Sequence, residues 1–560
     1  MAKFDLCSVR FQMVDTRIAV GAARVAVSMS SICTGWSGAS ASRLRAELSR
    51  RNLGSLQETA YSRLPFHRRP SRRTSRLRAR ASRAELPNPV KPSLNAFMWR
   101  VAVTAAVGGF LYGYDTGIIS GALLSISSEY QLSHSMQETV AAAILLGATI
   151  GGLSAGRFAD RFGRRSTIIA IAAIFTLGAA AASLAPNPSF LALARIVLGI
   201  AVGACSQSVP AYVAELAPAQ QRGKLVVAFS VAIGLGIVCA SLVGYGLHGI
   251  LSWRWMIAVG AAPAAFLFVA MFALPESPRW LIAHDRSGDA RLALARVRPE
   301  DADLDVELAA VAETVRQSRA SHTLGWRGLA APWVRPAVIA GCGTAAFTQL
   351  VGIEMMIYYT PTLLKGVGFG DAGALLTNVG TAIIYLVMTM LGLAIVDRIG
   401  RRRLALLTLP GAAASLAALG TLFALGRTGP DDTPSIIGCL FLFMVFQAGG
   451  LQVIGWLTGS EIYPLSVRGA GTSAQSATVW GSNLLLTGSA LSVIHHLGAS
   501  GAMWIYAGMN ALAFLFVWRF LPELKGRSLE EVEEALRRGR FTPHDFRSRD
   551  LRRSRSAAAV

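Results

Sequence analysis

The sequence predicts an all-α membrane protein in which twelve transmembrane helices form two pseudo-repeats of six. Composition is the first reason: 53% of the 560 residues are hydrophobic and only 15% are charged, whereas soluble domains carry about 25% charged residues. The second is that apolar stretches of about 20 residues, enough to cross a bilayer as a helix, recur from about position 97 onward. The third is that charged motifs of the first half return in the second.

Residues 1–95 form a basic extension with 18 Lys and Arg against five Asp and Glu. The segment is rich in Arg, Ser and Ala and has no apolar core, so it is not a secretory signal peptide. Transit peptides have such an Arg-rich, Ser-rich and acid-poor composition. We expect a disordered extension, and two interpretations stay open: an organelle transit peptide with a linker, or a solvated tail.

The apolar stretches fall into two sets of six. Residues 96–274 hold the first set, near 98–124, 136–156, 166–185, 189–213, 225–248 and 253–274. Residues 336–521 hold the second set, near 336–363, 373–396, 403–425, 435–459, 471–496 and 501–521. The polar segment 275–335 between them has helical periodicity, which predicts short surface helices of an intracellular linker. Residues 522–560 form a C-terminal tail.

Three charged motifs repeat in the same order in both halves. They are DRFGRR (160–165) with DRIGRR (397–402), ELAPAQQRG (215–223) with EIYPLSVRG (461–469), and PESPR (275–279) with PELKGR (522–527). The nearly constant offset indicates two parallel six-helix repeats. With twelve spans, all of these basic loops fall on one face of the membrane, which the positive-inside rule predicts to be cytoplasmic.

Taken together, the motifs resemble the sugar porter family of the major facilitator superfamily. The matching stretches include GGFLYGYDTGIISGAL (108–123), PAYVAELAPAQQRGKL (210–225), PESPRWL (275–281) and GSEIYPLSVRGAG (459–471). The resemblance implies the major facilitator fold and movement of sugars or polyols by alternating access, either proton-coupled or facilitated.

Charged residues at the predicted cytoplasmic helix ends are candidates for a gate. The resemblance implies that they form a network that holds the cytoplasmic side closed while the protein faces outward. The alternative is that they serve only as topology signals. The candidates are Asp160, Arg164, Glu215, Arg222, Glu276 and Arg279 in the first half, and Asp397, Arg401, Glu461 and Arg468 in the second.

The first predicted span carries an acid inside an apolar run. Its glycines 109, 113, 117 and 121 are spaced four apart, which gives a smooth ridge for close approach to another helix. Asp115 lies roughly 200° around the axis from Gly113, and an ionised Asp at a bilayer centre costs about 2.5–3.5 kcal/mol. Arg195 in the fourth span is the candidate partner. The resemblance implies that this pair is a proton-coupling site; the alternative is a permanent structural ion pair.

The resemblance implies a substrate site made of polar and aromatic residues at the positions that match the family pattern. The candidates are Gln349, Thr348, Glu354, Tyr358, Trp456, Trp480, Asn483 and Ser230. Thr348 and Ser230 stand where the family pattern has Gln, and Glu354 stands where it has Asn. These departures leave the substrate open, since Glu354 could bind a proton, hydrogen-bond a polyol or favour a cationic substrate.

We therefore predict a multi-pass integral membrane protein that moves a monosaccharide or polyol by alternating access, with proton coupling. A facilitative uniporter, such as a sugar exporter of the plastid envelope, and a sugar-sensing transceptor are alternatives. No nucleotide-binding loop or metal-ligand cluster stands out, so neither an enzyme nor a cofactor is expected. The expected partners are the sugar, the proton and the lipid bilayer, with no nucleic acid. We expect a monomer, in a plastid envelope or a plasma membrane.

Overall fold

The computed structural model describes residues 96–218, 222–298, 302–320 and 325–545, and it does not describe the side chains of 96, 222–224, 226 and 317–320. The expectations for residues 1–95 and for the end of the tail lie outside this part of the chain. Within it, all regular elements are helices.

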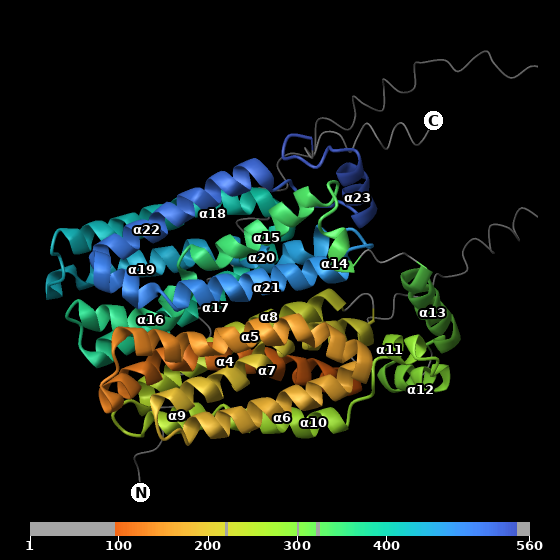
Figure 1. The fold of residues 1–560 in the computed structure, drawn as a ribbon, viewed down its shortest axis with the longest axis horizontal. Coiled ribbons are helices and arrows are strands. Elements are labelled where there is room, and N and C mark those ends of the chain that lie inside the picture. Colours follow the sequence, from red (N-terminus) through yellow and green to blue (C-terminus); the bar gives the residue numbers. More distant parts are fainter. Residues whose placement is uncertain (1–95, 219–221, 299–301, 321–324, 546–560) are drawn as a thin grey trace, which may run out of the picture. The chain divides into compact units, whose positions relative to one another are not determined.

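The first half consists of six helical paths (Figure 1). They are α4 (Ala96–Tyr130), α5 (His134–Phe162), α6 (Arg164–Ser183), α7 (Pro188–Leu216), α8 (Arg222–Leu247), and the pair α9 (Trp253–Ala258) and α10 (Ala261–Phe272). Short helices follow at one end of the bundle: α11 (Pro278–Ala283), α12 (Ser287–Val297), α13 (Leu304–Ala320) and α14 (Gly325–Gly328).

The second half repeats this arrangement. Its paths are the pair α15 (Arg335–Leu350) and α16 (Ile353–Gly366), α17 (Asp371–Ile399), α18 (Arg401–Ala424), the pair α19 (Thr433–Ala448) and α20 (Leu451–Glu461) after the turn η1 (Pro430–Asp432), α21 (Arg468–Thr487) and α22 (Ala490–Phe520). A last helix, α23 (Leu529–Arg537), lies at the same end of the bundle as α11 to α14 (Figure 1). The predicted fold of two six-helix repeats is confirmed.

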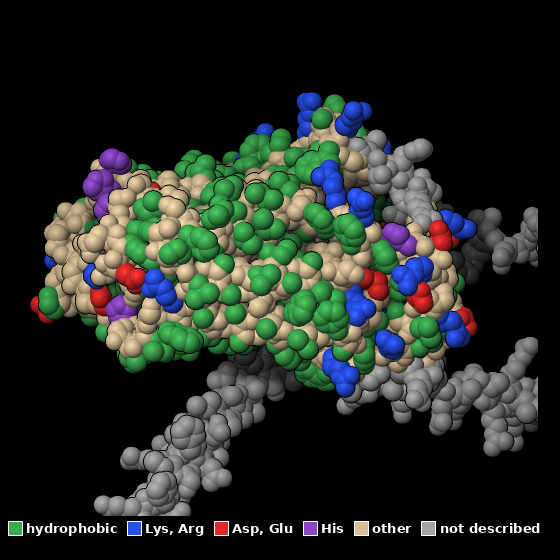
Figure 2. Space-filling view, turned by 60° about the horizontal axis from the view of Figure 1, so that its bottom comes forward, with side chains coloured by type: hydrophobic (Ala, Val, Ile, Leu, Met, Phe, Trp, Pro, Cys, Tyr) green, Lys and Arg blue, Asp and Glu red, His purple; other side chains and the backbone are tan. Residues whose placement is uncertain are grey.

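Ten of these twelve paths are long and apolar enough to cross a membrane. The other two, α4 and α21, run beside them but carry polar side chains that are buried in the bundle, including Asp115 in α4 and Asn483 in α21. Figure 2 shows hydrophobic side chains spread over the middle of the surface, with Lys and Arg gathered toward one end. Large apolar side chains such as Leu177 and Val269 are exposed, as contact with lipid requires.

Four of the predicted spans contain a break between two helices. The stretches 253–274, 336–363 and 435–459 are each two helices, and 471–496 breaks between α21 and α22. The second break occurs at Gly352, whose φ of 100° is a left-handed conformation that glycine adopts at little cost. A helix therefore begins in the middle of the bundle, so that the first turn of α16 faces the interior. Broken helices of this kind form the binding sites of many transporters.

Backbone contact between α4 and α8 confirms the predicted glycine ridge. A Cβ atom on Gly113 would collide with the carbonyl oxygen of Ile233, and one on Gly121 would lie 2.9 Å from the Cα atom of Gly244. The α5–α7 pair packs in the same way, because a Cβ atom on Gly199 would collide with the carbonyl oxygen of Ile144. These contacts hold α4 and α7 in place and with them the buried Asp115 and Arg195.

We predict that replacing Gly113 with Leu separates α4 from α8. Overpacking typically costs about 1–3 kcal/mol, so the apparent melting temperature of the purified protein in detergent should fall clearly. Gly156→Ala in α5 is the control, because a Cβ atom there meets nothing within 4 Å. Equal melting temperatures for the two variants would contradict the close α4–α8 contact.

Candidate functional site

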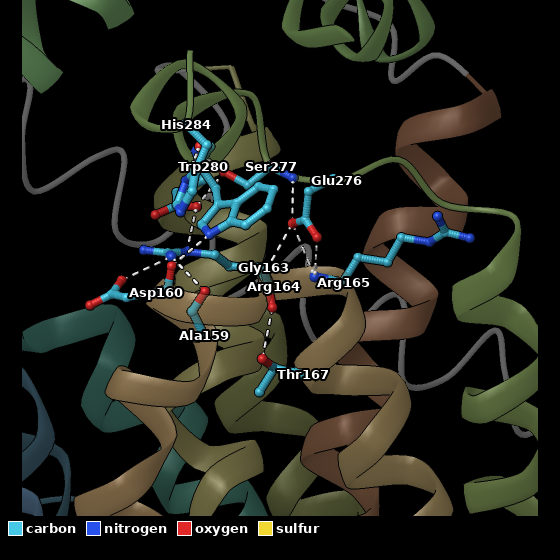
Figure 3. A network of polar contacts seen from close by, with 11 residues as sticks. Ala159, Asp160, Gly163, Arg164, Arg165, Thr167, Glu276, Ser277, Trp280 and His284 are labelled. Atoms are coloured by element: carbon cyan, nitrogen blue, oxygen red, sulfur yellow. Dashed lines mark hydrogen bonds and ion pairs between the residues drawn. The ribbon is translucent and has the colours of Figure 1, made fainter. Parts of the chain in front are cut away.

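A network of charged groups ties the helix ends of the first half together (Figure 3). Arg164 Nη1 lies 2.9 Å from Asp160 Oδ1, and Arg164 Nε lies 3.2 Å from Glu215 Oε2. The Glu276 carboxylate accepts hydrogen bonds from the backbone N–H groups of Arg164 and Arg165, at 2.9 and 3.1 Å. The Ser277 hydroxyl donates to Glu215. The ends of α5 and α7, the start of α6 and the segment before α11 are thus joined.

The second half repeats these contacts at the equivalent residues. Arg401 Nη2 lies 2.8 Å from Asp397 Oδ1 and 2.6 Å from Glu461 Oε1. The Glu523 carboxylate accepts a hydrogen bond of 2.9 Å from the Arg401 N–H group. The similarity between the motifs at 275–279 and 522–527 therefore has a structural reason: Glu276 and Glu523 accept the same kind of backbone hydrogen bond in the two halves.

A glycine precedes the arginine in both networks for the same reason. Gly163 and Gly400 have φ values of 95° and 101°, which disfavour other residues. A Cβ atom on either would also collide with the carboxylate of Glu276 or Glu523. Each glycine lets one carboxylate reach the first N–H groups of a helix, where the helix dipole stabilises negative charge.

The remaining gate candidates do not join these networks through ion pairs in the described part of the chain. Arg468 donates to the carbonyl oxygen of Ser460 at 2.8 Å. The positive charges of Arg279 and Arg468, which belong to different halves, interact repulsively. The side chain of Arg222 lies outside the described residues. Among the described ion pairs at this end of the bundle, none connects the two halves.

Two adjoining cavities lie between the halves. The first has a volume of about 250 Å³ and is lined by residues that include Tyr112, Ser230, Tyr385, Gln452 and Trp456. The second has a volume of about 480 Å³ and includes Arg468 at the end that carries the networks. Both contain Ser206, Pro210, Trp456 and Ser460. The interior is therefore reached from the end that carries the networks.

The halves touch each other at the opposite end. Ser492 of α22 donates from its backbone N–H and its hydroxyl to the Glu138 carboxylate of α5, at 2.7 and 2.6 Å. Asn378 of α17 donates to Ser120 of α4 at 2.9 Å. His248 Nε2 of α8 lies 3.4 Å from Asp371 Oδ2 of α17. One end of the bundle is thus closed by contacts between the halves, and the other contains cavities.

Asp115 and Arg195 lie inside the bundle, 5% and 1% exposed. Their charges attract each other, but no ion pair within 4.0 Å joins them. Asp115 Oδ2 and Arg195 Nε and Nη2 have no hydrogen-bond partner among the described residues. The two side chains can therefore form new contacts when the surrounding helices shift.

Of the eight predicted substrate residues, Trp456 and Ser230 line the open cavities. The other six are buried in the second half: Thr348, Gln349, Glu354, Tyr358, Trp480 and Asn483. Asn483 hydrogen-bonds Glu354, whereas the Thr348 hydroxyl donates to the Ala345 carbonyl oxygen of its own helix at 2.6 Å. Gln349 Oε1 and Trp480 Nε1 are buried without a partner among the described residues, so they can bind hydroxyl groups of a ligand.

The structure adds Tyr112 and Gln452 to this set. Tyr112 of α4 packs against Trp480 of α21 with 5.3 Å between ring centroids, and it lines the first cavity together with Gln452. Tyr112 precedes Asp115 by three residues, a spacing that places both on neighbouring parts of one helix surface. That spacing is the sequence signal that could have identified Tyr112.

A bundle of twelve helices in two parallel repeats, closed at one end and hollow at the other, defines a membrane transporter of the major facilitator type. A family model described as sugar (and other) transporter matches residues 101–536. The chain belongs to this family, which confirms the resemblance of its motifs.

Relatives and solved structures agree with this assignment. The chain is 37% identical to the putative metabolite transport protein YwtG of Bacillus subtilis, over 77% of this chain and 93% of that protein. It is 34% identical to the major myo-inositol transporter IolT of the same organism, over 79% and 95%. The fold matches an inward-open, partially occluded structure of the xylose transporter XylE from E. coli, with a TM-score of 0.67, 26% identity and coverage of 78% and 100%.

We predict that Glu276→Gln destabilises the first half. The carboxylate accepts several backbone hydrogen bonds, and hydrogen bonds to a charged group contribute about 1.5–3 kcal/mol. The melting temperature in detergent should therefore fall. Glu533→Gln is the control, because Glu533 forms a surface pair with Arg537 in α23, and such pairs contribute about 0.3–0.5 kcal/mol. A network without structural importance would give the same small shift for both variants.

Proposed function

We propose that the protein is a secondary transporter that moves a monosaccharide or polyol together with protons by alternating access. The observation that carries the proposal is the buried Asp115 and Arg195 in a bundle whose halves contact each other toward one end and enclose two cavities toward the other. Proteins similar to this chain are described as a glucose transporter of Staphylococcus epidermidis, a D-xylose transporter of Levilactobacillus brevis and a proton:xylose symporter. These names support both the substrate class and the coupling.

Proton coupling follows from the cost of buried charge. An ionised Asp115 attracts Arg195, and removal of one charge from a buried pair leaves the other uncompensated. Protonation of Asp115 therefore changes the relative free energies of the two packings of the halves. An effect of a few kcal/mol is enough to change which packing predominates.

The gate residues lie at one end of the bundle, and the contacts that hold the two halves together lie at the other. Both sets of contacts change in the same movement. The networks around Arg164 and Arg401 keep the helix ends of each half together, so that each half moves as a unit. Closure of the hollow end brings these networks toward each other. Arg279 and Arg468 lie where the two halves then meet. At the other end, the contact of Glu138 with Ser492 and that of His248 with Asp371 must break.

Substrate binding uses the buried residues between the two ends. Gln349, Asn483 and Gln452 supply amide groups for hydroxyls, and Trp456 and Trp480 supply ring surfaces for the apolar face of a sugar. A site built to hydrogen-bond particular hydroxyls rejects analogues that lack them, because its buried polar groups then stay unpaired.

A facilitative uniporter is the second candidate. It is favoured by the absence of an ion pair within 4.0 Å between Asp115 and Arg195 in this conformation. In that case the two groups stabilise helix packing only, and transport is indifferent to a pH gradient. For either carrier we propose a monomer, working in a plastid envelope if residues 1–95 direct it there and in a plasma membrane otherwise.

We predict that Asp115→Asn abolishes coupling and leaves substrate exchange. In proteoliposomes, the wild-type protein should acidify the interior when substrate is added outside, because proton and substrate enter together. The variant should lose this acidification and keep counterflow, since Asn stays neutral. Asp305→Asn in the exposed linker helix α13 is the control and should behave as wild type. The symporter proposal fails if Asp115→Asn still concentrates substrate along a proton gradient.

A further inference from the structure

We propose that Glu354 makes this carrier selective for sugars or polyols that bear a protonated amino group. The inference rests on the proposed transport function and adds the chemical class of the substrate. It starts from a carboxylate inside the bundle that lacks a cationic partner among the described residues.

Glu354 is buried and has few polar contacts. The side chain is 4% exposed, and its Oε2 atom has no hydrogen-bond partner among the described residues. The one side chain found to hydrogen-bond it is the neutral Asn483. A buried carboxylate is costly unless it is paired and hydrogen-bonded.

Charges elsewhere in the described interior do not compensate Glu354. Six charged side chains are buried: Asp115, Glu138, Arg195, Arg298, Glu354 and Arg401. Arg298 and Arg401 pair with carboxylates in the linker and in the second network, and Glu138 receives two hydrogen bonds from Ser492 at the closed end. The centre therefore holds two acids and one cation, and Arg195 attracts Asp115.

The position of Glu354 in its helix favours the ionised carboxylate. Glu354 lies in the first turn of α16, which begins directly after the break at Gly352. The N-terminal end of a helix stabilises negative charge. Together with the unpaired and buried Oε2 atom, this position lets Glu354 be ionised when a cation from the substrate lies beside it.

Three tyrosines lie within electrostatic range of the same carboxylate. Tyr112, Tyr358 and Tyr385 interact electrostatically with Glu354, and Tyr112 and Tyr385 also line the first cavity. Ring faces attract organic cations. An ammonium group on a ligand in the first cavity therefore comes next to Tyr112 and Tyr385, the two lining residues that interact electrostatically with Glu354.

A neutral sugar does not explain a carboxylate at this position. An amide supplies a donor and an acceptor for hydroxyl groups without a buried charge, and Asn is the residue of the family pattern that the sequence resembles here. An ammonium group is a donor like a hydroxyl and in addition neutralises the carboxylate. The opposing explanation is that Glu354 carries a second proton, in which case neutral sugars are moved with two protons.

The test is counterflow in proteoliposomes at a pH where amines are protonated. The probes are hexoses, their aminodeoxy derivatives with the amine at carbon 2, 3 or 6, and the matching N-acetyl compounds. At least one aminodeoxy sugar should exchange in preference to both its parent hexose and its N-acetyl form. Glu354→Gln should lower that preference by about 10- to 100-fold, the value of a hydrogen bond between charged groups, and Glu354→Asp should retain part of it.

Glu138→Gln is the matched control, because it also removes a buried carboxylate from the bundle but at the closed end. It should leave the ratio of aminodeoxy to neutral exchange unchanged. The inference is overturned if neutral hexoses exchange as well as every aminodeoxy sugar in the wild type, or if Glu354→Gln keeps the ratio. Exchange of none of these compounds, and of no pentose, inositol or linear polyol tested beside them, would instead overturn the proposed transport function, and this inference with it.

Charge movement separates the second-proton explanation from the proposed one. With the membrane potential clamped, the wild type should move two charges for each aminodeoxy sugar, one from the substrate and one from the proton at Asp115. Two charges for each neutral hexose, falling to one in Glu354→Gln, would show that Glu354 carries a proton and would overturn the proposal.

Discussion

The cost of charge in a low-dielectric interior is the constraint on which this structure depends. Asp115, Arg195 and Glu354 are buried where water cannot fully solvate them. Their positions depend on backbone contacts between glycine-rich helices, which place α4 against α8 and α7 against α5. Because these contacts fix one side of each helix, the charged side chains point toward the region where the halves meet. In the proposed mechanism, a change in any one of these charges alters the balance between two packings of the whole bundle.

Because of the charged networks, we expect each half to move as a rigid unit, which gives the bundle two discrete packings. Arg164 and Arg401 tie together helix ends within a half, and the described ion pairs at that end do not cross between halves. The hydrogen bonds that cross between the halves, such as that between Glu138 and Ser492, lie toward the other end. Strong contacts within each half and few between them are what a rocking movement of two rigid units requires.

Sequence patterns predicted whatever is local or repeated. Hydropathy predicted the helical paths, the four-residue spacing predicted the α4 ridge, and the recurring motifs predicted the equal roles of Glu276 and Glu523. The helix breaks were missed because a single glycine such as Gly352 in an apolar run gives no signal of a positive φ. Contacts between halves, including those of Tyr112 with Trp480 and of His248 with Asp371, join residues far apart in sequence. The arrangement of Asp115 and Arg195 likewise depends on how α4 and α7 pack, which no local pattern encodes.

The modest apolarity of α4 and α21 has a consequence for biogenesis. Leu, Ile, Phe and Val favour entry of a nascent helix into the bilayer, whereas central Asp, Lys and Arg oppose it by about 2.5–3.5 kcal/mol each. The helices that carry Asp115 and Asn483 are the two of the twelve described paths that are not both long and apolar enough for a membrane-crossing helix, so each enters the bilayer less readily alone. Neighbouring helices shield both of them from lipid. Helix α4 packs against α8, and α21 packs against α5 and α15. The neighbour of α4, α8, is synthesised later than α4. We therefore expect α4 to insert stably only after the chain has been made as far as α8.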